Sequence, residues 1–302
     1  MTPAAAPAMR AARFAPQLGA WIVENLDRGA SPAALVQALQ AQQMAADAAI
    51  AIMQAFVAAR AAGRPVPLDS LEWDTAAPAD FLCDTPRLAA GGTIQAVDRC
   101  VQVLARAQRP ALALLGGVLD ADECAELIAL ARDRLVPSTL VDVDSGHDVV
   151  SAQRRSVGMF FRPAENALIA RLDRRLAALM NLPPENGEGL QVLYYPNGGG
   201  SAPHFDFLLA ANPANRASLA RSGQRVATLV TYLNTVEGGG ETVFPQVGWA
   251  VSPQPGHAVQ FEYCNRLGQL DAASLHASAP VTRGEKWVAT KWMRERRFVP
   301  AG

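Results

Sequence analysis

The chain has 302 residues, of which 50% are hydrophobic and 18% are charged, and its formal net charge is −1. This composition predicts a globular protein that can bury a sizeable core, in one large domain or two smaller ones. The near-neutral charge leaves no electrostatic footprint for nucleic acid. The sequence has no run of about 18 or more purely apolar residues, so no membrane span is expected.

The four cysteines and the N-terminal segment bear on the compartment of the protein. Cys83, Cys100, Cys124 and Cys264 are widely scattered and form no Cys-x-x-Cys pair, which favours reduced thiols over disulfides. Residues 1–9 are rich in Ala and Pro but lack a basic segment followed by an apolar core, so no signal peptide is expected. We therefore expect a cytoplasmic protein, and the sequence leaves its oligomeric state open.

Residues 1–92 predict a small all-helical region followed by a linker. Residues 1–15 are expected to be disordered or loosely attached, and apolar residues at helical spacing predict helices within residues 16–62. Ser31-Pro32 has the form of an N-cap followed by proline at the first helical position. The simplest interpretation is a helical bundle that packs on the rest of the chain, and the alternative is a module that docks a partner or substrate.

The middle of the chain mixes strands and helices. Residues 94–108 fit either a helix or a strand. The predicted elements that follow are strands at 111–115 and 154–161 and helices that begin at 120 and cover 164–180. Asp120 is placed to cap its helix, with Glu123 three residues later completing a capping box. His147, in Ser-Gly-His-Asp, is interpreted as an exposed loop histidine.

After Pro183-Pro184 the pattern changes to short strands separated by turn signals. The predicted strands are 190–195, 225–234, 248–252, 258–263 and 286–294. Strands at this density, without helices between them, favour an antiparallel sandwich or jelly roll. The segment 208–222 fits either a lid or a plain surface loop, and His257 is interpreted as a turn residue. The predicted fold class is therefore α+β, with a jelly roll and flanking helices.

Three residues in this region are candidate metal ligands. Residues two apart in a strand project from one face, so His204 and Asp206 can point at one ion, and His276 would come from a distant strand. Two imidazoles and one carboxylate form the facial triad of non-haem Fe(II) oxygenases. A lone His-x-Asp pair is common by chance, but Lys286 strengthens it. The chain has two lysines, Lys286 and Lys291, among 27 Lys and Arg residues, and an ammonium is a compact point charge suited to a small pocket.

A series of ordered motifs runs through the same region. They read LQVLYY at 190–195, PHFD at 203–206, GQRVATL at 223–229, YLN at 232–234, GGETVFP at 239–245, SLHA at 274–277 and GEKWVATKW at 284–292. Together they closely resemble the catalytic domain of prolyl 4-hydroxylases, which are Fe(II)/2-oxoglutarate-dependent dioxygenases. The resemblance covers about residues 110–298. It implies a dioxygenase domain at 108–299 with a double-stranded β-helix core at about 188–296.

The resemblance also implies roles for single residues. The implied iron ligands are His204, Asp206 and His276, and the implied 2-oxoglutarate-binding residues are Lys286, Tyr195 and Thr228. Lys286 would pair with the distal carboxylate of 2-oxoglutarate. Lys291 points to the opposite face of the last strand and is expected to be a solvated surface lysine. Tyr195 could instead be a core tyrosine, and Thr228 an ordinary strand residue.

The family chemistry consumes 2-oxoglutarate and O₂, releases succinate and CO₂, and hydroxylates an unactivated C–H bond. L-Ascorbate rescues iron that is oxidised in uncoupled turnovers. The metal performs the hard step, so no catalytic side chain beyond the metal centre is nominated.

The substrate-contacting positions depart from the family pattern. The family tyrosine three residues before the first iron histidine is Ser201 here, and the family histidine two residues after Trp292 is Arg294. Trp292 itself can stack on a ring or an aliphatic group. A prolyl residue in a peptide or protein is the first expectation for the substrate. A free amino acid or other small molecule, or a non-catalytic metal-binding interaction module, are the alternatives.

Overall fold

The structure is a computed structural model that describes residues 9–28, 30, 32–61, 63–74, 81–137, 139–141, 148–150, 156–210, 212–266 and 268–301. It divides into two compact units, one formed mainly by residues up to Phe81 and the other by most of the chain from Leu82 onward. The predictions for residues 1–8, for the N-cap at Ser31, for His147 and for the start of the strand at 154 lie outside the described residues.

The first unit contains the predicted helices and a small sheet. Its elements are α1 (Pro16–Asp27), α2 (Pro32–Ala41), α3 (Ala46–Ala61), β1 (Met9–Arg13) and β2 (Ser70–Asp74). Ile22, Leu39 and Phe56 lie in its apolar core. The antiparallel pairing of β1 with β2 corrects the prediction of an all-helical region that starts from a loose segment. The strand was missed because the residues of β1, Met-Arg-Ala-Ala-Arg, show no alternation of apolar and polar side chains.

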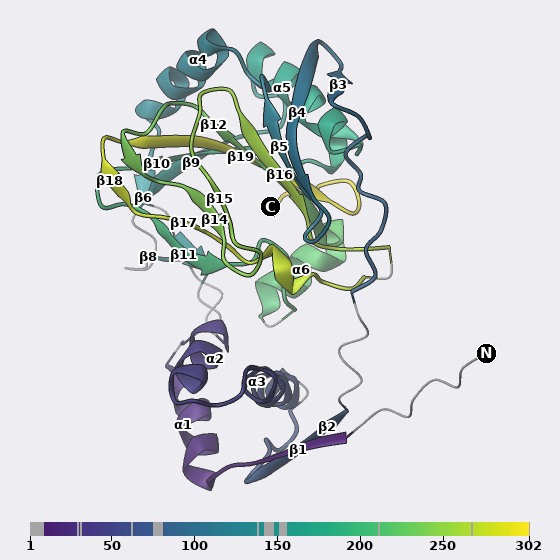
Figure 1. The fold of residues 1–302 in the computed structure, drawn as a ribbon, viewed down its shortest axis with the longest axis vertical. Helices are drawn as coiled ribbons and strands as arrows, with labels where there is room; N and C mark the ends of the chain where they lie inside the picture. The colour runs from purple at the N-terminus through teal and green to yellow at the C-terminus, as the bar shows by residue number, and fades with distance from the viewer. Residues whose placement is uncertain are drawn as a thin grey trace, which may run out of the picture. The chain divides into compact units, whose positions relative to one another are not determined.

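A large antiparallel sheet forms the frame of the second unit (Figure 1). In spatial order, its strands within the described residues are β3 (Thr93–Ala96), β4 (Arg99–Ala107), β5 (Leu112–Gly116), β16 (Ala258–Glu262), β12 (Arg225–Tyr232), β19 (Lys286–Arg294), β10 (Leu190–Tyr195), β9 (Val157–Phe161) and β6 (Val136–Pro137). Residues 94–108, which the sequence left undecided, are therefore strands. The sheet begins at Thr93, before the start at residue 108 that the resemblance implied.

A smaller antiparallel sheet carries the rest of the core. Among the described residues its order is β11 (Ser201–His204), β17 (His276–Ser278), β14 (Thr242–Phe244) and β15 (Trp249–Val251). Short pairs join β13 (Gly238–Gly239) to β18 (Val281–Arg283) and β7 (Thr139–Val141) to β8 (Asp148–Val150). Tyr232 and Val288 of the large sheet share one buried cluster with Phe244 and Val251 of the small one. The two sheets thus enclose a core between them, and the predicted α+β jelly roll is confirmed.

Two helices, α4 (Ala121–Arg132) and α5 (Ala167–Leu179), cover the outer face of the large sheet. Leu127 and Leu172 from these helices pack with Val192 and Ala289 from the strands. The predicted capping box at the start of α4 is present, because the Asp120 and Glu123 side chains each bind the other's backbone N–H. The remaining helical segments are α6 (Pro213–Ser222) and the 3₁₀ turns at Pro184–Asn186 and Ala272–Ser274.

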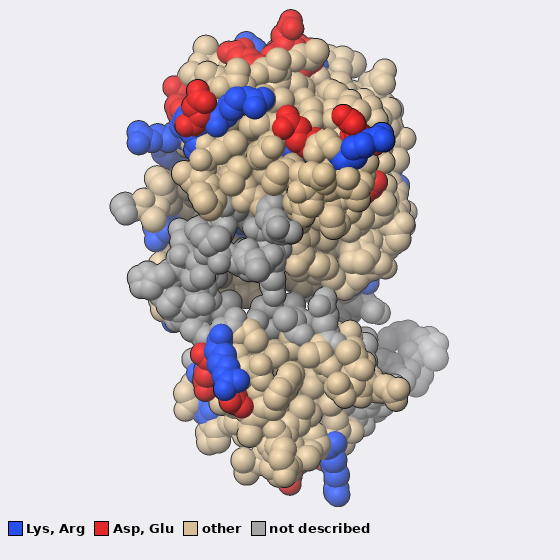
Figure 2. Space-filling model, turned by 90° about the vertical axis from the view of Figure 1, so that its left-hand side faces the viewer, with Lys and Arg blue, Asp and Glu red and all other residues tan. Residues whose placement is uncertain are grey.

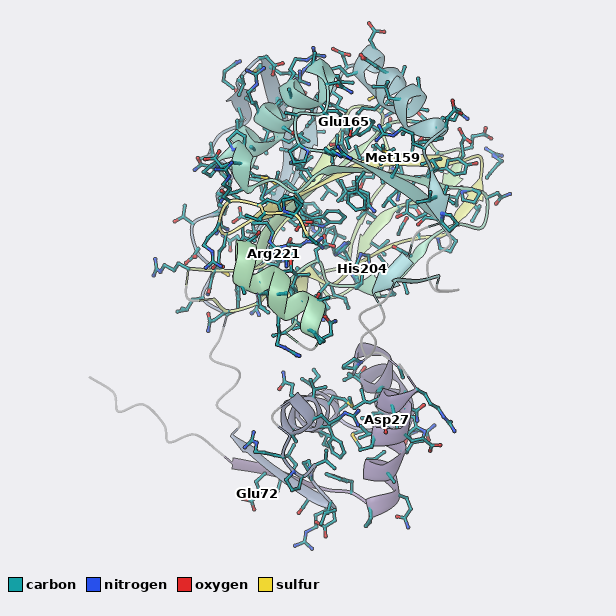
Figure 3. All side chains as sticks on the ribbon, turned by 180° about the vertical axis from the view of Figure 1, so that it is seen from behind. Asp27, Glu72, Met159, Glu165, His204 and Arg221 are labelled. Atoms are coloured by element: carbon teal, nitrogen blue, oxygen red, sulfur yellow. The ribbon has the colours of Figure 1, made fainter. Side chains whose placement is uncertain are left out.

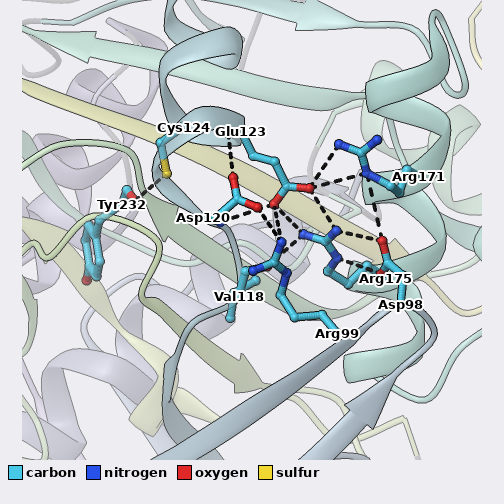
Figure 4. Close-up of polar contacts among 9 residues, drawn as sticks. All are labelled: Asp98, Arg99, Val118, Asp120, Glu123, Cys124, Arg171, Arg175 and Tyr232. Carbon is cyan, nitrogen blue, oxygen red and sulfur yellow. Dashed lines mark hydrogen bonds and ion pairs between the residues drawn. The ribbon is translucent and has the colours of Figure 1, made fainter.

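A buried ion cluster joins α4, α5 and the β3–β4 turn (Figure 4). Arg175, whose side chain is 1% exposed, lies 2.7 Å from Glu123 Oε2 and 2.7 Å from Asp98 Oδ2. Arg171 approaches Glu123 as well, at 3.1 Å. Burial opposes ionisation of Glu123, but the hydrogen bonds from Arg175 and from the Asp120 backbone hold its pKa below the ordinary value. Arg175, Glu123 and Asp98 in this cluster are therefore each paired with an opposite charge.

The surface is consistent with the small net charge. On the face in Figure 2, acidic and basic side chains lie next to one another in small groups that are separated by uncharged surface. In the part of the chain that the structure describes, no helix combines the length and the apolar character needed to cross a membrane.

Candidate metal centre

The two sheets bring His204, Asp206 and His276 to one point. His204 at the end of β11 pairs directly with His276 at the start of β17, and Asp206 follows in the next turn. Figure 3 labels His204 on its strand. The Nε2 atoms of His204 and His276 lie 3.8 and 3.7 Å from the two carboxylate oxygens of Asp206. In the described residues this is the one cluster of three or more ligating side chains that could hold a metal ion.

Both imidazoles are hydrogen-bonded through Nδ1 to a backbone carbonyl, and both Nε2 atoms lie near the Asp206 carboxylate. His204 Nδ1 lies 2.9 Å from the carbonyl oxygen of Ala202, and His276 Nδ1 lies 3.0 Å from that of Ser274. A carbonyl oxygen only accepts, so each Nδ1 carries a proton, and in a neutral imidazole Nε2 then keeps the lone pair that a metal ligand needs. The Nε2–carboxylate separations are shorter than two metal–ligand bonds of about 2.1 Å each, so one ion can reach all three groups.

Asp206 is held in its orientation by buried neighbours. The Thr228 hydroxyl donates to Asp206 Oδ2 at 2.7 Å and lies 3.1 Å from the Tyr263 hydroxyl. Burial opposes ionisation, but the charges of His276 and His204 in their protonated forms, the charge of Arg225 and the bond from Thr228 lower the pKa of Asp206 to about 2. The carboxylate is therefore ionised at neutral pH, as a metal ligand must be.

A buried ammonium lies in the same core. The Lys286 side chain is 1% exposed, and its Nζ donates to Ser278 Oγ at 2.8 Å. The ring centroids of Tyr195 and Tyr232 lie 5.3 and 5.8 Å from Nζ. Burial lowers the pKa of Lys286 to about 7, and the carboxylate of Glu241 opposes this shift. A desolvated ammonium among hydroxyl groups is suited to bind a carboxylate.

Some of the other predicted site residues lie in this core, and the others lie around it. Tyr195 lies beside Lys286, as the resemblance implied. Thr228 contacts Asp206 directly, so its hydroxyl orients the carboxylate. Ser201 accepts a hydrogen bond from the backbone N–H of Ser278. Trp292 is nearly buried, and the guanidinium carbon of Arg225 lies 4.3 Å from its ring centroid.

The prediction for Lys291 is wrong. Its side chain does point to the face opposite Lys286, but it is fully buried and donates to Asp173 Oδ1 at 2.7 Å and to the backbone oxygen of Glu188. The prediction failed because Asp173 is 118 residues away in the sequence and nothing local indicates the pairing.

Arg294 lies in a different setting from the one expected of a substrate contact. Its side chain is 2% exposed and lies 3.0 Å from Glu188 Oε1. It also donates to Ser218 and to the backbone oxygen of Gly223. The guanidinium is thus occupied by protein groups.

Sequence reasoning missed several residues at the site. Tyr232 and Ser278 contact Lys286, Arg225 contacts the backbone oxygen of Asp206, and Tyr263 contacts the Thr228 hydroxyl that binds Asp206. Ser278 could have been found, because it is two residues after His276 and two-residue spacing places both on one face of the strand. Tyr263 and Arg225 carry no such local signal, because their partners come from other strands.

A jelly roll that brings two imidazoles and a carboxylate to one point is the arrangement of non-haem iron(II) oxygenases. Residues 190–294 match the family model of the 2OG-Fe(II) oxygenase superfamily. "Probable prolyl 4-hydroxylase 7" of Arabidopsis thaliana is 38% identical over 207 residues, which are 63% of this chain and 64% of that relative. "Probable prolyl 4-hydroxylase 6" of the same plant is 40% identical over 208 residues, which are 63% of this chain and 70% of the relative.

A solved structure, the viral collagen prolyl hydroxylase of Paramecium bursaria Chlorella virus-1 in complex with 2OG, is 29% identical with a TM-score of 0.48. The matched region covers 61% of this chain and 95% of the viral chain. The chain belongs to the prolyl 4-hydroxylase family of 2OG-Fe(II) oxygenases. It spans about two thirds of the length of the two plant relatives, 64% and 70%.

Proposed function

We propose that the protein is an Fe(II)- and 2-oxoglutarate-dependent dioxygenase that hydroxylates a prolyl residue in a peptide or protein. The observation that carries the proposal is the convergence of His204, Asp206 and His276 at one point of a fold whose core also holds the ammonium of Lys286. Asp206 and His276 are buried there, and the His204 side chain is 41% exposed. When bound, iron with 2-oxoglutarate and O₂ supplies the oxidising power that hydroxylates an unactivated C–H bond.

The chain's own residues would bind the metal and the cosubstrate and fix their orientation. His204, Asp206 and His276 would hold the metal on one side and leave the other side open for cosubstrate and O₂. Lys286 would hold the distal carboxylate of 2-oxoglutarate, and Tyr195 would line the same pocket. The apolar cluster between the sheets keeps this core dry, which strengthens the ammonium–carboxylate attraction. The role proposed for Thr228 is to orient Asp206, in place of cosubstrate binding.

The wall beside Trp292 favours a peptide over a small apolar molecule. Trp292 Nε1 and Gln191 Oε1 are buried and have no hydrogen-bond partner among the described residues. Phe160, 52% exposed, lies 6.3 Å from the Trp292 ring. Unpaired buried polar atoms are costly. Both atoms are enclosed by protein, so the groups of this wall that a peptide can reach are the exposed Phe160 ring and the partly exposed Arg225. Arg225, part of the same wall, offers a cationic donor.

Two further parts of the proposal concern the reductant and the compartment in which the protein works. Ascorbate would keep the iron reduced when turnover is uncoupled. A cytoplasmic location is proposed because all four cysteines are free, as is usual for a reducing compartment.

The test is iron-dependent succinate formation. The protein is incubated in air with Fe(II), 2-oxoglutarate, ascorbate and a poly-L-proline peptide, and both succinate and hydroxylated proline are measured. We expect both products in equal amounts. Succinate without hydroxyproline would indicate that the substrate is another residue or a small molecule. Absence of iron-dependent succinate with any peptide or amino-acid pool would contradict the proposed activity.

A further inference from the structure

Glu188 is the centre of a buried arrangement next to the metal centre. Its carboxylate binds Arg225 with both oxygens, at 2.7 Å from Nε and 2.8 Å from Nη2. Arg294 Nη1 lies 3.0 Å from the same carboxylate. Burial opposes ionisation of Glu188, but Arg225 and Arg294 keep its pKa below the ordinary value. Two guanidinium groups therefore share one carboxylate.

The backbone of Glu188 is held by two residues of β19. Its N–H donates to the backbone oxygen of Trp292 at 3.0 Å, and its C=O accepts from the ammonium of Lys291. Lys291 reaches this carbonyl from the side of α5, where Asp173 binds it. Gly187 permits the approach, because a Cβ there would lie 2.5 Å from Lys291 Cε. The second lysine of the chain thus holds the residue that orients Arg225.

Arg225 is the member of this arrangement that reaches the site. Its side chain is 20% exposed, its guanidinium carbon lies 4.3 Å from the Trp292 ring centroid, and its Nη1 lies 3.4 Å from the backbone oxygen of Asp206. Arg294 and Lys291, by contrast, are 2% and 0% exposed. A substrate next to Asp206 can touch Arg225 and cannot touch the other two.

We propose that Arg294 and Lys291 are positioning residues that act through Glu188 to hold Arg225 against Trp292, ready for a carbonyl oxygen of the substrate. The inference rests on the proposed function for its substrate, but the positioning is a property of the protein alone. Arg294 also ties this arrangement to the end of α6, through the backbone oxygens of Ser218 and Gly223. In Figure 3, α6 is marked by Arg221.

The first arm of the test needs no substrate. The Arg225 Nε–H is followed by NMR hydrogen exchange in the wild type, Arg294→Met and Lys291→Met, with Arg225→Lys to assign the signal. Loss of one charge-assisted hydrogen bond corresponds to a change of about ten- to a hundredfold in an equilibrium constant. The Nε–H should therefore exchange faster by about that factor in both variants. An unchanged exchange rate in folded Arg294→Met and Lys291→Met would overturn the proposal.

The second arm measures turnover of a poly-L-proline peptide. Arg294→Met and Lys291→Met should raise the peptide KM by about ten- to a hundredfold and release succinate without hydroxyproline, while the KM for 2-oxoglutarate stays as in the wild type. Arg294→Lys keeps one cation beside Glu188 and should recover part of the loss. If an active wild type and the two variants gave the same peptide KM, the positioning role would be wrong.

Arg171→Met is the matched control. Arg171 lies on α5 like Asp173, but its ion pairs are with Glu123 and Asp98, which do not belong to the arrangement around Glu188. Its loss should lower stability without changing the Arg225 signal or the peptide KM. A wild type without iron-dependent turnover would contradict the proposed function, and the exchange arm would still decide the positioning of Arg225.

Discussion

Lys286 Nζ donates a hydrogen bond to Ser278 Oγ at 2.8 Å, inside the core between the two sheets. Ser278 is two residues after His276, so one short strand carries both a candidate metal ligand and the partner of the ammonium. This strand therefore ties the position proposed for the metal to the position proposed for the distal carboxylate of 2-oxoglutarate.

The first prediction concerns Lys286→Met. The variant keeps the apolar stem of the side chain and removes the charge, so a bound dicarboxylate loses its charge-assisted partner. The KM for 2-oxoglutarate should rise by about ten- to a hundredfold. Anaerobic iron binding, measured by equilibrium dialysis, should not change, because Lys286 is not a ligand. An unchanged requirement for 2-oxoglutarate would show that the ammonium has another role.

The second prediction concerns pH. Burial lowers the pKa of Lys286 to about 7, and a bound carboxylate should return it toward its ordinary value near 10.5. Binding then takes up a proton above pH 7, so affinity for 2-oxoglutarate should fall as pH rises from 7, by up to about tenfold per pH unit. Lys286→Arg stays charged and should bind with little pH dependence, and an equally steep curve for Lys286→Arg would count against the assignment.

The same shift predicts the effect of pH on stability. The unfolded chain holds its Lys286 proton up to about pH 10.5, whereas the folded protein releases it near pH 7. Between these values the unfolded state binds more protons, so this group makes stability rise with pH. Urea denaturation of the wild type and Lys286→Met at pH 7 and pH 9 checks the sign. The gain on going to pH 9 should be smaller in the variant.

The third prediction concerns Thr228, whose hydroxyl holds Asp206 Oδ2. Thr228→Val has nearly the same shape but cannot donate, so the carboxylate loses the partner that orients it. Loss of such a partner typically lowers metal affinity by about 10- to 100-fold. Thr228→Ser keeps the hydroxyl and is the control. Equal iron affinity of all three proteins by dialysis would assign the hydroxyl a structural role only.

The fourth prediction concerns the buried ion cluster of Arg175. Arg175→Met leaves the buried Glu123 without its main partner, and breaking a buried pair in this way costs about 3–5 kcal/mol of unfolding free energy. Arg134→Met, which removes a pair with Glu165 at the surface, should cost less than about 1 kcal/mol. Urea denaturation compares the two, and similar losses would contradict the view that burial decides the cost.

Much of the fold could be predicted because local patterns carry it. The strands at 190–195 and 286–294 follow from short runs of strand-forming residues between turn signals, the capping box at Asp120 follows from cap chemistry, and the structure contains all three. The alternation of side-chain direction along a strand explains why Lys286 shares the face of Val288, which lies in the core between the sheets. These features need only the residues next to them in the sequence.

The rest depends on contacts between distant residues. Lys291 appeared to be a surface lysine because its partner, Asp173, lies on a helix 118 residues earlier. Arg294 appeared to be open to substrate, but Glu188 and the end of α6 occupy its guanidinium. In β1, five residues without alternation form a strand only because β2 pairs with them. The direction of a side chain follows from its neighbours in the sequence. The residue that it contacts depends on how distant segments fold together.

The central claim is that His204, Asp206 and His276 hold one iron ion to which 2-oxoglutarate binds. The most direct measurement is anaerobic equilibrium dialysis of Fe(II) against the wild type and His276→Ala, with and without 2-oxoglutarate, followed by succinate formation on exposure to air. We expect one iron per chain in the wild type, tighter binding with 2-oxoglutarate, and loss of both iron and succinate in His276→Ala. Full iron binding and turnover by a folded His276→Ala would contradict it.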